Sequence, residues 1–240
     1  SKHLLPIYNK PMIYYPLSTL MLGGIREYLI ITNPSYLKLY QDLLGYGDDL
    51  GINIRYKVQK KPEGLPQAFI IGEKFIDNEP VCLNLGDHIF FGNDVNRLLK
   101  KNINSFKKTT IFAYRYEKPN EYGVINLNKK NRPISILEKP VKPKSNLIVC
   151  GLYIYDKNVV ELSKNLKFSK RGELEISDLN NLYLKNNTLN VEIIDKKNHW
   201  IDAGSPEKIF EASKLIESIE KRKKSYIGFP EIAALKKRYI

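Results

Sequence analysis

The feature that most constrains the fold is the regular alternation of helix-like and strand-like segments in the first half of the chain. The runs 28–31 and 81–85 are short, mostly apolar and bounded by turn residues, which is typical of strands buried on both faces of a sheet. Segments with helical character occur at 10–23, 36–44, 65–75 and 94–103, with a further strand expected at 54–58. Strands and helices at this spacing predict right-handed crossovers and a mostly parallel sheet in an α/β fold.

The second half of the chain has a different character, from Thr109 onward. Short polar turns separate four strand-like segments, at 110–116, 123–127, 134–138 and 147–155. Two helices, a strand and a final helix are expected after them, at 158–166, 175–185, 189–194 and 206–224. Because no internal repeat or linker interrupts the sequence, we expect one domain over 1–240. In it, a β-rich insertion (109–204) separates an α/β part (1–108) from a helical part (205–240).

The net charge of +13 would suit nucleic acid, but the type of basic residue argues against such a partner. Lysine contributes 31 of the 39 basic side chains and arginine only 8. Base reading and bidentate phosphate contacts favour arginine. We therefore interpret the charge as a solvated, lysine-rich surface that favours anionic substrates in a general way.

The sequence also bears on the compartment. No apolar run approaches the roughly 20 residues that a membrane-spanning helix needs, and Pro6 interrupts a start that does not resemble a signal peptide. Cys82 and Cys150 lie in apolar runs without a CxxC partner, which favours reduced, buried thiols over a disulfide. We therefore expect a soluble, cytoplasmic protein with no membrane partner.

Two aspartates stand where apolar strands end. Asp87 follows the run 81–85 through Gly86, and Asp202 follows the segment 199–201. In an open α/β sheet, ligands collect at the carboxyl ends of strands. Mg²⁺ prefers one or two carboxylates, with phosphate oxygens and waters completing its coordination. The pair predicts a Mg²⁺ site on a bound nucleotide, although each aspartate alone would also suit a turn or a helix cap.

Three further segments carry side chains suited to an anionic sugar or nucleotide. Lys139 lies between Glu138 and Pro140 at a strand end, where it could hold a sugar-phosphate oxygen while Glu138 accepts from sugar hydroxyls. The alternative is a surface ion pair before a proline turn.

The three histidines are neither clustered nor spaced for a metal, and we interpret them as non-catalytic.

The other two segments lie before helices. The amide of Gln59 can match the donor and acceptor pair on the edge of a pyrimidine, and Gly64 would let backbone groups approach the same base. Arg171 precedes a helix N-terminus, an arrangement that suits a phosphate. The alternative for that segment is ordinary helix capping by Glu173 and Glu175.

Taken together, these segments resemble the glucose-1-phosphate thymidylyltransferase family over essentially the whole chain. The matching runs are 1–18, 59–68, 85–92, 121–124, 138–140, 144–146, 151–156 and 171–176. The resemblance implies an α/β fold of the nucleotide-diphospho-sugar transferase type, with a Rossmann-like, mostly parallel sheet and an inserted sugar-binding β region. It also implies a homotetramer that makes dTDP-glucose and pyrophosphate from dTTP and α-D-glucose 1-phosphate, the first step of dTDP-rhamnose biosynthesis.

The resemblance also assigns roles to individual residues. By this likeness Asp87 and Asp202 hold Mg²⁺, and the catalytic cations that contact phosphates are Lys2, Lys139 and Arg171. Gln59 and Gly64 are implied to read the thymine and Leu65 to pack by the deoxyribose, with Pro62 as a further substrate-binding residue. Those implied around the glucose are Tyr122, Gly123, Glu138, Lys139 and Val149, and Trp200 is implied to back the site.

One part of the family pattern is not among these 240 residues. It comprises the glycine-rich loop Gly-Gly-x-Gly-Thr-Arg-Leu and the strand before it, and the chain also stops short of the family's closing helices. The sequence therefore leaves three hypotheses. They are the thymidylyltransferase itself, a related UTP-using sugar-1-phosphate nucleotidyltransferase, and a non-catalytic remnant that binds a sugar nucleotide.

Overall fold

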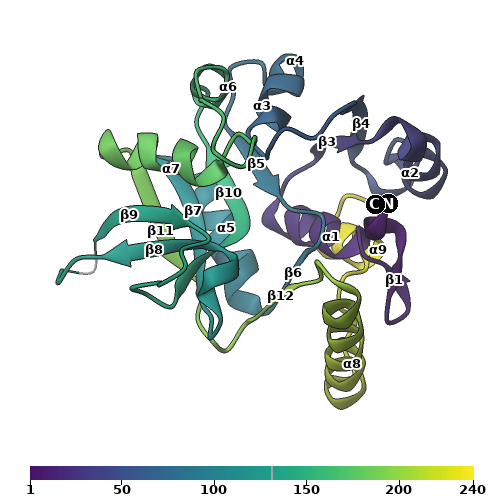
Figure 1. Cartoon of the computed structure of the whole chain (residues 1–240). Helices are drawn as coiled ribbons and strands as arrows, with labels where there is room; N and C mark the ends of the chain where they lie inside the picture. The colour runs from purple at the N-terminus through teal and green to yellow at the C-terminus, as the bar shows by residue number, and fades with distance from the viewer. Residues whose placement is uncertain (131) are drawn as a thin grey trace. The chain divides into compact units, whose positions relative to one another are not determined.

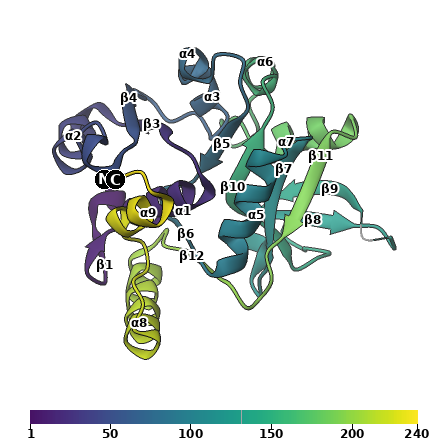
Figure 2. The ribbon, with the colours of Figure 1, turned by 180° about the vertical axis from the view of Figure 1, so that it is seen from behind.

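The computed structural model describes residues 1–130 and 132–240, apart from the side chain of Asn93. The chain folds into two compact units, whose elements are labelled in Figures 1 and 2. The first unit comprises Ser1–Tyr56, Asn84–Ser105 and Lys197–Ile240, and the second comprises Lys57–Leu83 and Phe106–Lys196. The expected single domain in three parts stays a prediction.

The first unit combines helices with pairs of short strands. Its strands are β1 (Pro6–Ile7), β2 (Lys10–Pro11), β3 (Glu27–Thr32), β4 (Asn53–Val58, whose last two residues fall in the second unit), β6 (His88–Phe91) and β12 (His199–Asp202). Its helices are α1 (Tyr14–Gly23), α2 (Leu37–Leu44), α5 (Asn93–Asn104), α8 (Pro206–Lys223) and α9 (Pro230–Lys237). The strands pair as β1 with β2, β3 with β4, and β6 with β12. Helix α1 packs against α5 and α9, so apolar faces far apart in the sequence share one core.

The second unit is built on a sheet with both parallel and antiparallel pairs. Its strands are β5 (Val81–Asn84, whose last residue falls in the first unit), β7 (Thr109–Arg115), β8 (Gly123–Leu127), β9 (Pro133–Glu138), β10 (Leu147–Tyr155) and β11 (Leu189–Ile193). Its helices are α3 (Gln67–Ile71), α4 (Glu73–Ile76), α6 (Val159–Lys164) and α7 (Ile176–Lys185). The strand order is β11-β7-β10-β8-β9, and β5 also pairs with β10. Strand β11 runs parallel to β7, whereas β10 runs antiparallel to β7 and β8, so the sheet is mixed.

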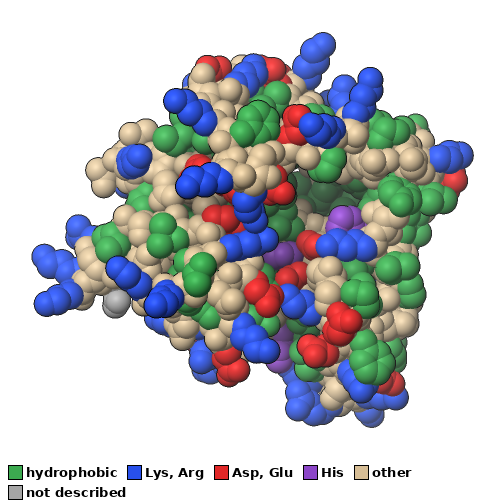
Figure 3. Space-filling model, viewed as in Figure 1, with side chains coloured by type: hydrophobic (Ala, Val, Ile, Leu, Met, Phe, Trp, Pro, Cys, Tyr) green, Lys and Arg blue, Asp and Glu red, His purple; other side chains and the backbone are tan. Residues whose placement is uncertain are grey.

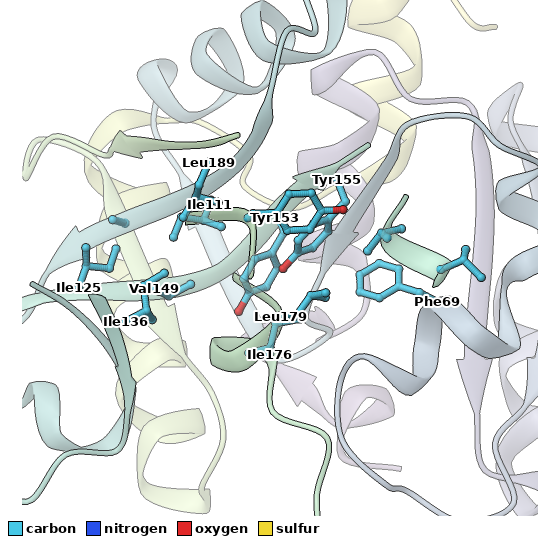
Figure 4. Close-up of a cluster of buried hydrophobic side chains, with 14 of the residues drawn as sticks. Phe69, Ile111, Ile125, Ile136, Val149, Tyr153, Tyr155, Ile176, Leu179 and Leu189 are labelled. Atoms are coloured by element: carbon cyan, nitrogen blue, oxygen red, sulfur yellow. The ribbon is translucent and has the colours of Figure 1, made fainter. Parts of the chain in front are cut away.

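The core of the second unit centres on β10, which is buried at every position. Tyr153 and Tyr155 stack with their ring centroids 5.8 Å apart, and Phe69 meets Tyr155 edge-on at 5.1 Å (Figure 4). The Tyr155 hydroxyl donates to Asn180 Oδ1 at 2.6 Å, which satisfies a buried polar group. Helix α7 also packs on β9. The strand ends that carry the candidate sugar residues therefore project from a close-packed support.

The structure confirms most of the expected elements, corrects two helices and adds two elements. The helix expected from residue 10 begins at Tyr14, because Lys10 and Pro11 pair with β1 in a hairpin. The helix expected over 65–75 is two short helices that meet at Gly72. Strand β6 and helix α9 were not expected. Strand β6 has only 4 residues and α9 only 8, which is too short for a clear hydrophobic period.

The surface agrees with the interpretation of the charge. On the face shown in Figure 3, Lys and Arg side chains are spread over the surface with Asp and Glu among them. Among the helices of the described ranges, none combines the length and apolar character needed to cross a bilayer. Cys82 and Cys150 are both free thiols, and burial raises the pKa of Cys82 to about 12.

Candidate active site

Strands β6 and β12 bring the two predicted metal aspartates together in the first unit. Asp87 directly precedes β6 and Asp202 ends β12, and the antiparallel register sets Asp202 opposite His88. The Ala203 amide donates to the Asp87 carbonyl at 2.8 Å, which closes this end of the pair. The side chains of Asp87 and Asp202 are only 18% and 14% exposed.

His88 lies between these two carboxylates. Its Nε2 is 3.9 Å from Oδ1 of Asp87 and 3.9 Å from Oδ1 of Asp202. The indole Nε1 of Trp200 donates to His88 Nδ1 at 3.3 Å. Because an indole N–H can only donate, Nδ1 must accept, and the neutral ring carries its proton on Nε2, facing the carboxylates. The sequence analysis set His88 aside, and the structure places it among the candidate site residues.

Two lysines neutralise the outer oxygens of the carboxylates. Lys2 Nζ lies 2.5 Å from Asp87 Oδ2, and Lys208 Nζ lies 3.0 Å from Asp202 Oδ2. Burial opposes ionisation of Asp87, but the electrostatic interaction with His88, the hydrogen bond and charge of Lys2, and the electrostatic interaction with His3 outweigh it. Together they hold the pKa of Asp87 below its usual value. Asp87 is therefore a carboxylate at neutral pH.

This donor set fits a Mg²⁺ ion on a nucleotide. Oδ1 of Asp87 and Oδ1 of Asp202 each lie 3.9 Å from Nε2 of His88, so the two carboxylates are neighbours. No cluster of three or more His, Cys, Asp or Glu residues suited to a metal occurs within residues 1–130 and 132–240. Mg²⁺ does not require such a cluster, because it takes one or two carboxylates together with phosphate oxygens and water.

The predicted glucose residues of the second unit gather where β8 and β9 pair. Gly123 lies opposite Glu138 in the register, and a Cβ on Gly123 would approach Ser177 Oγ to 2.9 Å and Glu138 Oε2 to 3.4 Å. The Ser177 hydroxyl donates to Glu138 Oε2 at 2.5 Å. The same Cβ would lie 3.7 Å from Cγ2 of Val149. Ser177 thus holds one oxygen of Glu138, and the side chains of Ser177 and Glu138 leave little room for a Cβ at Gly123.

Lys139 has an unusual backbone conformation. Its φ of +41° lies in the left-handed region, which costs a non-glycine residue free energy. The Lys139 amide donates to the Tyr122 carbonyl at 3.0 Å, which ties the strained residue to the start of β8. Tyr122 is itself buried and meets Tyr116 edge-on at 5.5 Å. The backbone at Lys139 is therefore held by its hydrogen bond to Tyr122, whose ring is itself packed against Tyr116.

Arg171 is held by Glu175. Arg171 Nε lies 3.0 Å from Glu175 Oε1, and Arg171 Nη2 lies 2.8 Å from Glu175 Oε2. The Ser169 hydroxyl donates to the same Oε1 at 2.7 Å. Burial of Glu175 is outweighed by its bonds to Arg171 and Ser169 and by the charges of Arg171 and Lys139, which lower its pKa. Glu175 is the N-cap residue of α7, but its side chain makes no capping bond, so the capping alternative for Glu175 is wrong.

The predicted thymidine residues lie in the loop between β4 and α3. Gln59 Nε2 donates to Gln67 Oε1, and the backbone of Gly64 bridges to Leu174 in parallel register. Gly64 has a φ of +109°, and a Cβ there would lie 2.1 Å from the Leu174 carbonyl oxygen. Pro62 and Leu65 are exposed on this loop. The loop is therefore joined to the segment that carries Arg171 at a point where only glycine fits.

The predicted site residues thus form local groups in both units. Lys2, Asp87, Trp200 and Asp202 come together in the first unit, and the others occupy the β8–β9 end, the Arg171 segment and the 59–65 loop of the second. Sequence reasoning missed the residues that hold these side chains in place, which are Gln67, His88, Ser177 and Lys208. It considered Glu175 only as a cap. The spacing of Arg171 and Glu175, four residues apart, was the one available signal.

Comparison with known proteins identifies the family. Residues 1–219 match the family model described as Nucleotidyl transferase. The chain is 50% identical over 220 residues to the glucose-1-phosphate thymidylyltransferase of Neisseria meningitidis serogroup A, covering 92% of this chain and 76% of the relative. It is 42% identical over 240 residues to the enzyme of that name from Mycolicibacterium smegmatis, covering 100% of this chain and 83% of the relative.

Solved structures confirm the predicted type of α/β fold. A protein assigned as glucose-1-phosphate thymidylyltransferase from Bacillus anthracis, crystallised with a sucrose, superposes with a TM-score of 0.81 at 36% identity. The match covers 89% of this chain and 85% of that one. UDP-glucose pyrophosphorylase in complex with UDP-glucose shares the fold with a TM-score of 0.79 at 24% identity, covering 91% and 90% of the two chains. The chain therefore belongs to the nucleotidyl transferase family, and within it to the glucose-1-phosphate thymidylyltransferases.

Proposed function

We propose that this chain transfers a thymidylyl group from dTTP to α-D-glucose 1-phosphate, giving dTDP-glucose and pyrophosphate. The observation that carries the proposal is the 50% identity over 92% of the chain to a glucose-1-phosphate thymidylyltransferase. In this reaction an oxygen of the sugar phosphate attacks the α-phosphorus of dTTP as the bond to pyrophosphate breaks. The sugar phosphate is already an anionic nucleophile, so catalysis needs positioning and charge neutralisation more than a side-chain base.

The pair of aspartates in the first unit supports a dependence on Mg²⁺. Asp87 and Asp202 would hold the ion, whose positive charge, when bound, offsets the repulsion between the two reacting anions. Lys2 already pairs with Asp87 at 2.5 Å and would contact phosphate oxygens. The largely buried setting of both carboxylates favours such a role, because electrostatic attraction is stronger where water is excluded. Trp200 would act as a wall of the site.

The residues of the second unit would bind the sugar phosphate and the base. Lys139 and Arg171 would hold the phosphate of glucose 1-phosphate, and Glu138 would accept hydrogen bonds from sugar hydroxyls. Tyr122, Gly123 and Val149 would surround the glucose. The loop residues Gln59, Pro62, Gly64 and Leu65 would bind the thymidine part.

A second nucleotide is supported by the chemistry of Gln59. Thymine and uracil present the same ring N–H and carbonyl oxygens to an amide, so Gln59 suits dTTP and UTP alike. Turnover with UTP in place of dTTP would test this alternative.

We also propose that the product serves dTDP-rhamnose biosynthesis. We further propose that the protein forms a homotetramer, and light scattering after gel filtration would test this oligomeric state.

The main experiment measures pyrophosphate release from dTTP, glucose 1-phosphate and Mg²⁺. The 240-residue chain would be compared with a version that also carries the family's first strand and glycine-rich loop. We expect turnover in at least the extended version, and its loss in the matched variants Asp87→Asn and Asp202→Asn. Absence of turnover in both folded proteins would overturn the proposal. Binding of dTDP-glucose without turnover in either protein would favour the sugar-nucleotide-binding alternative.

A further inference from the structure

We propose that Gln67 is a positioning residue that fixes the amide of Gln59 with its oxygen outward, and so selects thymine and uracil over cytosine. The inference rests on the proposed function, because it takes Gln59 as the residue that reads the base. It is carried by a chain of hydrogen bonds among Gln59, Glu63 and Gln67, all within the second unit.

The orientation of the Gln67 amide follows from two groups whose chemistry is unambiguous. The backbone N–H of Glu63 can only donate, and it lies 3.1 Å from Oε1 of Gln67. The ionised carboxylate of Glu63 can only accept, and its Oε2 lies 2.8 Å from Nε2 of Gln67. Both contacts require the same orientation of the amide. Gln67 therefore keeps its oxygen on the side that faces Gln59.

The orientation of Gln59 follows from that of Gln67. The two side chains meet at 2.5 Å, with Nε2 of Gln59 donating to Oε1 of Gln67. Because Gln67 offers only an oxygen at this point, a flipped Gln59 would place two acceptors against each other. In the part of the chain that the structure describes, Oε1 of Gln59 accepts no hydrogen bond. Gln59 therefore keeps one acceptor and the second N–H of its Nε2 for a ligand.

This fixed amide matches one kind of pyrimidine. Thymine and uracil carry a hydrogen on ring nitrogen N3 beside a carbonyl oxygen, which complements the oxygen and remaining N–H of Gln59. Cytosine has an unprotonated N3, so its lone pair would face the oxygen of Gln59 and leave both acceptors unsatisfied. The terminal amide torsion of a free glutamine is broad and two-fold, so an unrestrained Gln59 could flip to suit either base. The discrimination therefore depends on Gln67.

The test compares calorimetric binding of dTDP-glucose with binding of its cytidine counterpart, dCDP-glucose, to the 240-residue chain. We expect the unmodified chain to prefer dTDP-glucose by at least about tenfold. Gln67→Met keeps the length of the side chain but cannot accept from Gln59, and should reduce that preference about tenfold. The double change Glu63→Gln with Gln67→Glu exchanges the two side-chain groups and restores an acceptor toward Gln59. It should retain the preference.

Gln41→Met, the same type of change on α2 of the first unit, is the control and should leave the preference unchanged. A purely structural role of Gln67 would weaken both ligands equally in Gln67→Met, and that result would overturn the inference. Loss of the preference in the folded double variant would also overturn it, which keeps the test decisive if Gln67→Met does not fold. Failure of the unmodified chain to bind either ligand would instead count against the proposed function.

Discussion

The guanidinium of Arg171 and the carboxylate of Glu175 meet through two hydrogen bonds, Nε to Oε1 at 3.0 Å and Nη2 to Oε2 at 2.8 Å. The Glu175 side chain is only 9% exposed, whereas that of Arg171 is 42% exposed. Glu175 therefore acts as a buried anchor that fixes one edge of the guanidinium. The pair also raises the pKa of Arg171, so the arginine stays charged whatever the working pH.

Removing the charge of this anchor should weaken binding of the sugar phosphate. In Glu175→Gln the bidentate contact is lost, and Arg171 gains freedom that it must lose again when it binds a phosphate. We expect the Michaelis constant for glucose 1-phosphate to rise about tenfold, with a smaller change in kcat. Steady-state kinetics on the active form would measure both. Glu173→Gln is the control, because Glu173 touches Arg171 only at 3.3 Å from an exposed position, and an equal effect there would contradict the prediction.

The same pair should contribute to stability in a pH-dependent way. The pKa of Glu175 is lower in the folded protein than its ordinary value of 4.5, so its ionised form stabilises the fold. That contribution is complete above about pH 4.5 and is lost as the pH falls through the lowered pKa. Urea unfolding should therefore show Glu175→Gln less stable than the unmodified protein at pH 7. The difference should shrink in acid, and a difference that stays constant with pH would show that ionisation of Glu175 is not its source.

Lys208 should compete with a metal for Asp202. Its ammonium lies 3.0 Å from Oδ2 of Asp202, so a cation bound by that carboxylate meets a neighbouring positive charge. We expect Lys208→Met to tighten Mn²⁺ binding by about three- to tenfold, followed by electron paramagnetic resonance. Lys214→Met, on the same helix but with its ammonium over the Phe210 ring, should leave the Mn²⁺ affinity as it was. Weaker Mn²⁺ binding in Lys208→Met would mean that the lysine supports the site rather than competing with the ion.

Two glycines with positive φ should differ in the cost of adding a methyl group. At Gly64 a Cβ would collide with the Leu174 backbone at 2.1 Å, whereas at Gly172 no atom lies within 4 Å of it. Both alanine variants have an unfavourable φ, which costs about 1 kcal/mol. The collision at Gly64 should raise the loss of unfolding free energy to about 3 kcal/mol. Chemical unfolding would measure both losses, and equal values would show that the loop moves aside without cost.

Much of the fold followed from local sequence patterns. The apolar run 147–155 matches β10 at both ends, and Ser205 and Pro206 open α8 as capping chemistry predicts. The strands that escaped were those decided by pairing. Strand β6 is extended because it pairs with β12, and Lys10 and Pro11 form a strand because they pair with β1. The partner of β6 lies far along the chain and leaves no local period, and β1 and β2 are too short to show one.

The candidate site also combines features that the sequence determines with features that only the tertiary structure decides. The sequence alone determined which side chains carry charge, amides and carboxylates at strand ends, and the family to which that pattern belongs. Only the tertiary structure decided which groups hold most of them, since His88, Gln67 and Ser177 act through contacts with residues outside their own helix or strand. A hydrogen bond or ion pair depends on distance and angle across separate elements, and the local sequence pattern does not encode those distances.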